Sequence, residues 1–449
     1  MNERDSETIA GLLEQMGYTG AACGYVEADV IVVNICSVRE NADNRFFGLL
    51  GHIKHVKLER PDVIVVVCGC MMQQEHITEQ IRDKHAWVDL IFGTHNIDAL
   101  PEMIGDVLRA REAEKDTARA GGKQGAHMPK AFVLPERLSL VEGLPARRLF
   151  SFKASVNIMY GCNNFCTYCI VPYTRGRETS RGVEDILEEI RGLAAAGTKE
   201  ILLLGQNVNS YANEGADFAD LIGMVNGIPG IERIRFMTSH PKDLSNKLVD
   251  KFGPVDRGGA AHLCPSIHLP VQAGSTRILE RMNRRYTKED YIALVDKLRQ
   301  ARPDIVVSTD IIVGFPGETD EDFAETMDVI ERVRFDAAFT FLFSPRKGTP
   351  AAEYGDRVPE ETQRERFDHM VRRLNAITLE KNRAYIGSEQ DVLVEGAAKT
   401  GAPMMAGRTF NGKLVNFTAP EGMELTGSIV PVRVTAVKTF SFTGELIKG

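Results

Sequence analysis

Apolar positions in the first third of the chain change between a helical spacing and short continuous runs. Residues 5–16 repeat apolar side chains every three to four positions, which predicts an amphipathic helix that begins near Asp5 or Ser6 and ends at Gly17. Three runs rich in β-branched residues follow, ADVIVVNIC, DVIVVVCGC and WVDLIFGTHN, with helix-length segments between them. Continuous apolar strands that alternate with helices are typical of a parallel sheet covered on both faces. We therefore expect a doubly wound parallel α/β domain over residues 1–115. Such a domain usually opens with a strand, so we expect that its first strand would stand before Met1 and is missing from this sequence.

The same alternation returns at Phe152, after a segment without clear periodicity. Residues 116–147 mix charges, glycines and prolines, which indicates a linker that could include one edge strand. Six strand candidates then follow: SFKASVNIMYG, KEILLLGQN, IERIRFMTSHP, SIHLPVQAG, VVSTDIIVGFPGE and AAFTFLFSP. Six parallel βα units fit a closed or partly open barrel of the TIM type, whose site lies at the carboxyl ends of the strands. We place this barrel at residues 148–382, with a long amphipathic helix from about Pro359 to Ala384 packed on it.

The last segment, residues 383–449, has a different pattern. Short alternating strands are separated by turn glycines and helix signals are few, which predicts a small antiparallel β-barrel. Such barrels often bind single-stranded or looped RNA, and Arg408, Lys413 and Phe417 are the candidate contacts. A purely structural β cap is the alternative, because the charges of the segment are nearly balanced.

Composition limits the classes of partner. The chain has 449 residues and a formal net charge of -8, which argues against indiscriminate coating of nucleic acid. No apolar run reaches the length of a membrane span and the N-terminus reads MNERDSE, so we expect a cytoplasmic protein with no membrane and no DNA partner. The net charge does not exclude local basic patches, such as Arg175, Arg177 and Arg181, or Arg281, Arg284 and Arg285. Of these, Arg175 and Arg177 are candidates for RNA contact.

Candidate chemistry is concentrated in the stretch GCNNFCTYCIVPYTRGR. Cys162, Cys166 and Cys169 form a C-x3-C-x2-C run directly after the first barrel strand. Three thiolates on one loop can hold three irons of a [4Fe-4S] cluster, which leaves the fourth iron open to a small molecule. A zinc site would need a fourth ligand or a second C-x2-C pair, and a disulfide would need an oxidising compartment. The spacing therefore favours a cluster with an open iron.

Two further cysteines end strands in the first domain. Cys36 and Cys70 follow the first two apolar runs, and parallel strands bring their carboxyl ends to the same rim of a sheet. Topology alone therefore brings two thiols together. Small core residues are the alternative for this pair, and for Cys68 and Cys23 a structural role is favoured.

The remaining candidates lie at the tips of the barrel strands. The cofactor candidates are Gln206 and Asn207 after the second strand, Ser239 and His240 after the third, His268 and Gln272 near the fourth, and Gly314 and Glu318 in the fifth, with Tyr168 beside the cysteines. His268 could equally be an interior histidine, and Tyr168 could simply pack. GFPGE lacks the lysine and hydroxyl residue of a phosphate loop, so its glycines more plausibly let the backbone approach a flat adenine.

Several long blocks together resemble the methylthiotransferase family of radical S-adenosylmethionine enzymes. They are NICSVRENA, GCMMQ, YGCNNFCTYCIVPYTRGRE, LLLGQNVNSY, FMTSHP, HLPVQAGSTRILERMNRRY, DIIVGFPGET and FLFSPRKGTPA. The resemblance implies a methylthiotransferase domain, a radical barrel and a C-terminal TRAM domain that binds tRNA. It also implies a second [4Fe-4S] cluster, for which Cys36 and Cys70 match the second and third ligands. The first ligand of the family pattern would stand before Met1, so we expect that the sequence begins after it. Whether this polypeptide binds the auxiliary cluster is therefore an open question.

The resemblance further implies the reaction. Two molecules of S-adenosylmethionine are used, one to methylate a sulfur on the auxiliary cluster and one, at the open iron, to give a 5′-deoxyadenosyl radical. The radical would remove hydrogen from C2 of adenosine 37 beside the tRNA anticodon, with electrons from a low-potential donor such as flavodoxin or ferredoxin. LLLGQNVNSY resembles members that act on N6-dimethylallyladenosine. The rivals are sister enzymes for threonylcarbamoyladenosine or a ribosomal aspartate, and a non-catalytic iron–sulfur RNA-binding protein.

Overall fold

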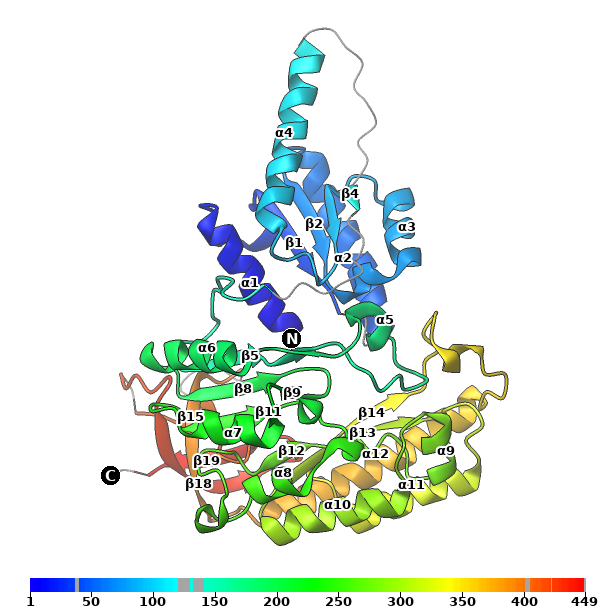
Figure 1. Cartoon of the computed structure of the whole chain (residues 1–449), viewed down its shortest axis with the longest axis vertical. Coiled ribbons are helices and arrows are strands. Elements are labelled where there is room, and N and C mark those ends of the chain that lie inside the picture. Colours follow the sequence, from blue (N-terminus) through cyan, green and yellow to red (C-terminus); the bar gives the residue numbers. More distant parts are fainter. Residues whose placement is uncertain (37–39, 120–129, 132–140, 400–403, 421, 448–449) are drawn as a thin grey trace. The chain divides into compact units, whose positions relative to one another are not determined.

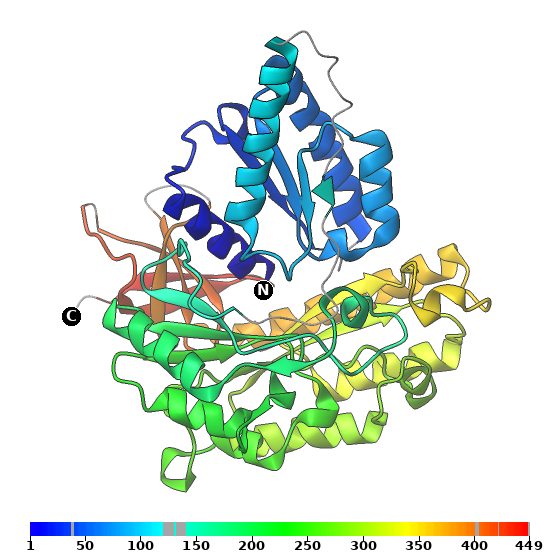
Figure 2. The same ribbon diagram turned by 45° about the horizontal axis from the view of Figure 1, so that its top comes forward.

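The computed structural model describes residues 1–36, 40–119, 130–131, 141–399, 404–420 and 422–447 (Figures 1 and 2). The chain divides into two compact units. The first contains residues 1–149 with the returning segments 160–163 and 170–179, and the second contains residues 150–159, 164–169 and 180–449. Within these described ranges, no helix combines the length and the apolar character needed to cross a membrane.

The first unit is a parallel sheet with helices on both faces. Its strands are β1 (Val30–Asn34), β2 (Ile64–Cys68), β3 (Leu90–Phe92) and the edge strand β4 (Lys130–Ala131), in the order β1-β2-β3-β4. Its helices are α1 (Asn2–Gln15), α2 (Glu40–Glu59), α3 (Glu75–Lys84) and α4 (Leu100–Arg119), with the short α5 (Val171–Arg175) on a returning segment. In β2, Val65 and Val67 face a core shared with α2 and α3, and Ile64 and Val66 face a second core shared with α1 and α4. This arrangement confirms the predicted doubly wound sheet.

The start of α1 differs from the prediction. The helix begins at Asn2 rather than near Asp5 or Ser6, because the backbone N–H of Asp5 already donates to the Met1 carbonyl at 2.8 Å. Asp5 is therefore inside the first turn, where its buried carboxylate serves another purpose described below. The end of the helix is as predicted, with Gly17 at a φ of 89°.

The second unit contains the six predicted barrel strands. They are β5 (Lys153–Asn157), β8 (Glu200–Leu204), β11 (Arg233–Phe236), β12 (Ser266–His268), β13 (Val306–Val313) and β14 (Ala337–Leu342). All are parallel and pair in chain order as two three-stranded sheets, β5-β8-β11 and β12-β13-β14, with a bridge from Ile234 to Leu263 between them. The helices are α6 (Val183–Ala195), α7 (Phe218–Asn226), α8 (Asn246–Lys251), α9 (Thr276–Arg281), α10 (Lys288–Ala301) and α11 (Asp320–Val333). Parallel strands that share a direction place their carboxyl ends on one rim of the sheet.

Helix α12 (Glu360–Arg383) confirms the predicted long amphipathic helix. Met370, Leu374 and Ile377 are buried in the same core as the barrel strands, and Phe367 packs against that core. The spacing of these four residues places them on one face, so a single stripe joins the helix to the barrel.

The C-terminal segment is a closed barrel of β15 (Glu389–Ala397), β16 (Met404–Thr409), β17 (Leu414–Thr418), β18 (Ile429–Val437) and β19 (Phe442–Leu446). The strands close in the order β15-β16-β17-β19-β18, and β17 pairs with β19 in parallel. The prediction of an antiparallel barrel was therefore wrong for one pair. Five strands cannot alternate direction around a closed ring, so an odd number of parallel pairs is unavoidable.

This small barrel is attached to the amino-terminal ends of the parallel strands. Arg233, the first residue of β11, donates to the carbonyls of Arg408 at 2.8 Å and Asp391 at 2.7 Å. Arg235 donates to the Thr409 carbonyl at 2.9 Å. The amino rim of the parallel strands is thereby joined to the C-terminal barrel, and the carboxyl rim carries the cysteine loop.

Candidate functional site

The three cysteines of the C-x3-C-x2-C run lie on the loop after β5. The chain's eight cysteines, all within the described ranges, form no disulfide; Cys166 is buried, and Cys162 and Cys169 are half-buried. The N–H of Cys169 donates to the Cys166 carbonyl at 2.9 Å, so the second half of the run is a tight turn. Gly161 has a φ of 72°, and a Cβ there would stand 2.1 Å from the Arg177 carbonyl oxygen. Only glycine fits where the loop begins.

The thiols suit an iron–sulfur cluster better than a single metal ion. A structural zinc ion needs four ligands that converge on one point, and this loop supplies three thiols. An iron–sulfur cube has a different requirement, because its thiolate ligands bind separate iron atoms. Three soft sulfur donors without disulfides on one short loop fit that requirement.

A segment more than a hundred residues further along the chain holds the cysteine loop. The Met282 carbonyl, just past the end of α9, accepts from the Thr167 N–H at 3.1 Å. The side-chain amide of Asn283 donates to the carbonyls of Asn164 and Phe165 at 3.0 Å each. The backbone of the loop is therefore fixed by the barrel as well as by its own turns.

The next residue in this segment reaches a cysteine directly. Arg284 is 4% exposed, and its Nη1 lies 3.5 Å from the sulfur of Cys166. Its Nε donates to the Tyr286 hydroxyl at 2.9 Å and its Nη2 donates to the Pro270 carbonyl at 2.8 Å. Arg284 was expected on a surface patch with Arg281 and Arg285, and that expectation was wrong for it.

The tips of β8 and β11 carry buried polar atoms without partners in the described chain. They are Oδ1 of Asn207, Oγ of Ser239 and Nε2 of His240, on residues that are at most 5% exposed. Asn207 uses only its amide group, which donates to Asp243 at 2.7 Å. Because buried polar groups nearly always have a partner, these three atoms are the places where a polar ligand at this rim is expected.

The ring of His240 is held in its neutral form. Burial, and secondarily the positive charge of Arg284, lowers the pKa of His240 to about 2. The Nδ1 atom accepts from the Lys242 N–H at 3.2 Å, which puts the ring proton on Nε2. His240 therefore presents a neutral donor at the rim throughout the physiological pH range.

Backbone strain gathers at the same rim. Of the seven non-glycine residues with positive φ in the described chain, five lie on these loops: Phe165, Thr238, Gln272, Asn283 and Arg285. Asparagine tolerates this conformation, but β-branched Thr238 and long Arg285 do so only at a cost. Strained conformations persist where the surrounding structure imposes them, often at ligand sites.

Other predicted strand-tip residues have protein partners. His268 contacts Ser308 Oγ through Nδ1 at 3.1 Å and Asp310 Oδ2 through Nε2 at 3.4 Å, the arrangement that an interior histidine would have. Gln272 is buried and exchanges backbone hydrogen bonds with β13. Gln206 and Tyr168 are half-buried, and Tyr168 packs against the barrel core. A cofactor contact by any of them stays a prediction.

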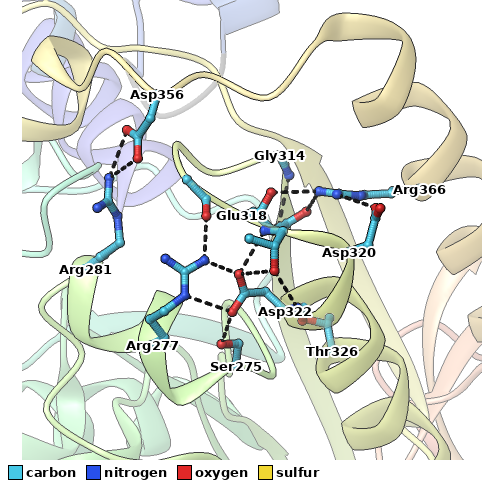
Figure 3. Close-up of polar contacts among 12 residues, drawn as sticks. Ser275, Arg277, Arg281, Gly314, Glu318, Asp320, Asp322, Thr326, Asp356 and Arg366 are labelled. Carbon is cyan, nitrogen blue, oxygen red and sulfur yellow. Dashed lines mark hydrogen bonds and ion pairs between the residues drawn. The ribbon is translucent and has the colours of Figure 1, made fainter.

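Gly314 and Glu318 belong to a network that ties α12 to the barrel (Figure 3). The carboxylate of Glu318 accepts from Arg366 Nη1 at 2.7 Å and from the Gly314 N–H at 3.2 Å. Burial raises the pKa of Glu318, against the opposing effect of Arg366. Each oxygen of an ionised carboxylate can accept more than one hydrogen bond, so the expected contact of Glu318 with a cofactor stays a prediction. Gly314 has a φ of 76°, which glycine adopts readily, and its approach to a cofactor stays a prediction.

The two thiols of the first unit lie where the strand pattern predicted. Asn34 and Cys68 are paired at the ends of β1 and β2, so Cys36 and Cys70 each stand two residues beyond the same rim. Both interact electrostatically with Arg175, whose guanidinium pairs with Asp5 at 3.1 Å. The described chain thus supplies two sulfurs and a buried cation at one edge. Cys68 is a core residue, as expected, and burial raises the pKa of its thiol.

Only some of the predicted RNA contacts lie on the surface. Arg175 and Arg181 are buried, Arg175 against Asp5 and Arg181 against Glu189, so neither lies on a basic surface. Arg177 is exposed, as an RNA contact requires.

The same division holds in the C-terminal barrel. Phe417 is fully buried in the barrel core, so the expectation that it contacts RNA was wrong. The Lys413 amine is tied to Asn382 Oδ1 at 3.0 Å, and burial lowers its pKa. Arg408 remains largely exposed, with its side chain 45% accessible. The inward side of an alternating strand can be recognised only once the register is known.

Family models match all three regions of the chain. Residues 156–330 match the Radical SAM superfamily, residues 1–93 match Uncharacterized protein family UPF0004, and residues 383–447 match the TRAM domain. Two solved structures share the fold at low identity. The radical S-adenosylmethionine methyltransferase TsrM from Kitasatospora setae has a TM-score of 0.54 at 15% identity, covering 77% of this chain and 73% of that one. The cobalamin-dependent radical enzyme OxsB has a TM-score of 0.51 at 14% identity, covering 83% of this chain and 53% of that one. Fold and cysteine loop together define a radical S-adenosylmethionine protein.

Full-length relatives identify the family within this class. Proteins named tRNA-2-methylthio-N(6)-dimethylallyladenosine synthase are 49% identical over 100% of this chain in Alkaliphilus oremlandii, covering 91% of the relative, and in Acetivibrio thermocellus, covering 89%. A namesake from Clostridioides difficile is 46% identical over 100% of this chain and 89% of its own length. The chain belongs to the tRNA-2-methylthio-N(6)-dimethylallyladenosine synthase family, a family of radical S-adenosylmethionine methylthiotransferases.

Proposed function

We propose that this enzyme converts N6-dimethylallyladenosine at position 37 of tRNA into its 2-methylthio derivative. The observation that carries this proposal is identity of 49% along the whole chain to relatives with that named activity, together with the cysteine loop at the carboxyl rim. The C2–H bond of an aromatic base is too inert for acid or base catalysis at neutral pH, so radical chemistry is the expected route. The reaction would take place in the cytoplasm, where thiols stay reduced.

The chain's own residues divide the work between two places. Cys162, Cys166 and Cys169 would hold one [4Fe-4S] cluster, and Cys36 and Cys70 would contribute to a second. The first cluster supplies an open iron at which S-adenosylmethionine can be bound and reductively cleaved. The protein holds the loop through Met282 and Asn283, whose hydrogen bonds fix its position before any ligand arrives.

The strand tips would orient the nucleoside cofactor. Asn207 Oδ1 can accept a hydrogen bond from a donor group of S-adenosylmethionine. Ser239 Oγ and His240 Nε2 can donate hydrogen bonds to its acceptor groups. Because His240 is neutral, it adds no positive charge beside the sulfonium of that cofactor. Gly314, whose φ of 76° suits glycine, would let the backbone lie against the adenine ring.

The RNA would meet the enzyme through exposed cations. Arg408 on the C-terminal barrel and Arg177 on the returning segment of the first unit are the candidates that stay accessible. The target base lies in a loop, so presenting it to the barrel costs less than extrusion from a duplex. A low-potential donor such as flavodoxin or ferredoxin would supply the electrons.

Mass analysis of tRNA nucleosides tests this proposal. Deletion of the gene should remove the 2-methylthio group from isopentenylated adenosine, and wild-type but not Cys166→Ala plasmid should restore it. Loss of the group from threonylcarbamoyladenosine instead would show a sister activity. An unchanged nucleoside profile would overturn the proposed function.

A further inference from the structure

Arg284 is a buried cation without a carboxylate counterion. It is 4% exposed, and no ion pair of Arg284 occurs among the described residues, although ion pairs of other arginines are common in this unit. A buried charge is costly unless it is paired and hydrogen-bonded. Its neutral acceptors, the Tyr286 hydroxyl and the Pro270 carbonyl, satisfy two directions of the guanidinium and do not balance its charge.

The remaining nitrogen of the Arg284 guanidinium, Nη1, faces the sulfur of Cys166. Nη1 lies 3.5 Å from Sγ, within the distance of a hydrogen bond to sulfur. A thiol carries no charge, but the metal-bound form of cysteine is the thiolate. Binding of a cluster by Cys166 would therefore supply the negative charge that Arg284 lacks.

The backbone around Arg284 supports a role at this cysteine. Asn283 and Arg285 on either side have positive φ angles of 60° and 54°, and Phe165 beside Cys166 has a φ of 45°. The Asn283 amide is bonded to the same loop. Both partners of the Arg284 to Cys166 contact are thus held in strained and mutually bonded segments, which fixes the guanidinium against the sulfur.

We propose that Arg284 is a positioning residue of the radical cluster, which donates a hydrogen bond to the Cys166 sulfur and holds a fixed positive charge beside the cluster, so that the cluster is reduced more easily. Hydrogen bonds to sulfur and nearby charge are established determinants of iron–sulfur potentials. The inference rests on the proposed function, since it needs a cluster at Cys162, Cys166 and Cys169.

The test is an EPR-monitored redox titration of the reconstituted full-length protein. All variants carry Cys36→Ala and Cys70→Ala, so that the signal comes from the radical cluster alone. In Arg284→Gln, we expect the ratio of reduced to oxidised cluster at the parent midpoint to fall about tenfold, which is about 59 mV for one electron. Arg284→Lys keeps the charge but cannot make three directed bonds, so its midpoint should lie between the two.

Arg233→Gln is the matched control. Arg233 is also a buried arginine of the second unit, but it donates to the carbonyls of Arg408 and Asp391 and not to sulfur. Its midpoint should equal that of the parent. Unchanged midpoints in both Arg284 variants at full iron content would overturn the inference and leave the proposed function intact. If Arg284→Gln takes up no cluster, Arg284→Lys decides, and a parent midpoint there overturns the inference. A parent protein that takes up no cluster contradicts the proposed function itself.

Discussion

The two rims of the parallel strands both carry buried polar side chains, but only one rim satisfies them. At the amino rim, Arg233 and Arg235 donate to backbone carbonyls of the C-terminal barrel, and Arg235 pairs with Glu200 at 2.9 Å. At the carboxyl rim, Asn207, Ser239 and His240 each keep a buried polar atom that has no partner within the described chain. Complete pairing marks an interface built for stability, and incomplete pairing marks a place for a ligand.

The same contrast separates the two buried arginines. The guanidinium of Arg233 donates to two backbone carbonyls, which are present whenever the protein is folded. Its hydrogen bonds therefore do not depend on a ligand. The guanidinium of Arg284 contacts the thiol of Cys166, which becomes a negatively charged thiolate when it binds metal. A substitution at the amino rim should therefore lower stability with little effect on the site, and a substitution at the carboxyl rim should do the reverse.

The largest expected effect is at the cysteine loop. Cys166→Ala should lose the iron of the radical cluster after reconstitution, because two thiolates do not hold the cube, and the melting temperature of the iron-free protein should change little. Iron analysis, visible absorption and thermal unfolding measure both. Full iron content in the variant would show that the cluster is not bound at the carboxyl rim.

At the amino rim, the expected effect is on folding. Arg233→Ala removes a buried guanidinium that makes two part-buried hydrogen bonds to carbonyls, which should lower the free energy of unfolding by about 3 kcal/mol. Affinity for S-adenosylmethionine should be retained in the folded fraction. The control is Arg302→Ala, which removes an exposed ion pair with Asp304 and should cost less than about 0.5 kcal/mol. Equal losses in the two variants would contradict a structural role for the amino rim.

A pH effect follows from the neutral His240. Its folded pKa of about 2 is depressed below the ordinary value, so the unfolded chain binds more protons as the pH falls, and stability is lost from about pH 6.5 downward. At pH 5 the loss should be about 2 kcal/mol relative to pH 8. Urea unfolding of wild type and His240→Gln at both pH values isolates this contribution. Equal pH dependence in the two proteins would show that His240 is not held neutral.

Ser239 gives a smaller effect in the opposite direction to Arg233. Ser239→Ala removes a hydroxyl that has no partner in the described chain, so the free energy of unfolding should stay the same or rise. The Kd for S-adenosylmethionine, measured by calorimetry on the iron-loaded protein, should rise about tenfold. Ser245→Ala, which removes the N-cap of α8, should show the converse, with a loss of stability and an unchanged Kd. A wild-type Kd in Ser239→Ala would remove this hydroxyl from the proposed ligand contacts.

The smallest effect concerns the RNA. Arg408→Gln should weaken tRNA binding by less than about tenfold and reduce the salt dependence of log K by about one ion, as expected for loss of one phosphate contact. Lys438→Gln on the same barrel is a matched change of charge. An unchanged salt dependence in Arg408→Gln, with the affinity of wild type, would move the RNA surface away from Arg408.

The sequence predicted those features that depend on local pattern and strand direction. The six barrel strands, α12 and the common rim of Cys36 and Cys70 all followed from apolar runs and the rule that parallel strands share a carboxyl edge. The position of the cysteine loop after the first barrel strand was predicted from the C-x3-C-x2-C run alone. Each of these features is encoded within one segment or repeated between neighbouring segments.

Side chains whose role depends on distant contacts were harder to place. Arg284 and Arg175 were expected on basic surfaces, because nothing near them in sequence shows that Cys166 and Asp5 lie opposite. Phe417 was taken as a candidate RNA contact, although it faces the barrel core, because the register of its strand was unknown. One signal was available for Arg284: it directly follows Asn283, a residue type that tolerates a left-handed turn, at the end of a helix.

The proposed function requires that the cysteine loop at the carboxyl rim supports reductive cleavage of S-adenosylmethionine. The most direct measurement is the release of 5′-deoxyadenosine by the anaerobically reconstituted, dithionite-reduced protein. Wild type should release it, and Cys166→Ala should not. Release of none by fully iron-loaded wild type, or equal release by Cys166→Ala, would contradict the account.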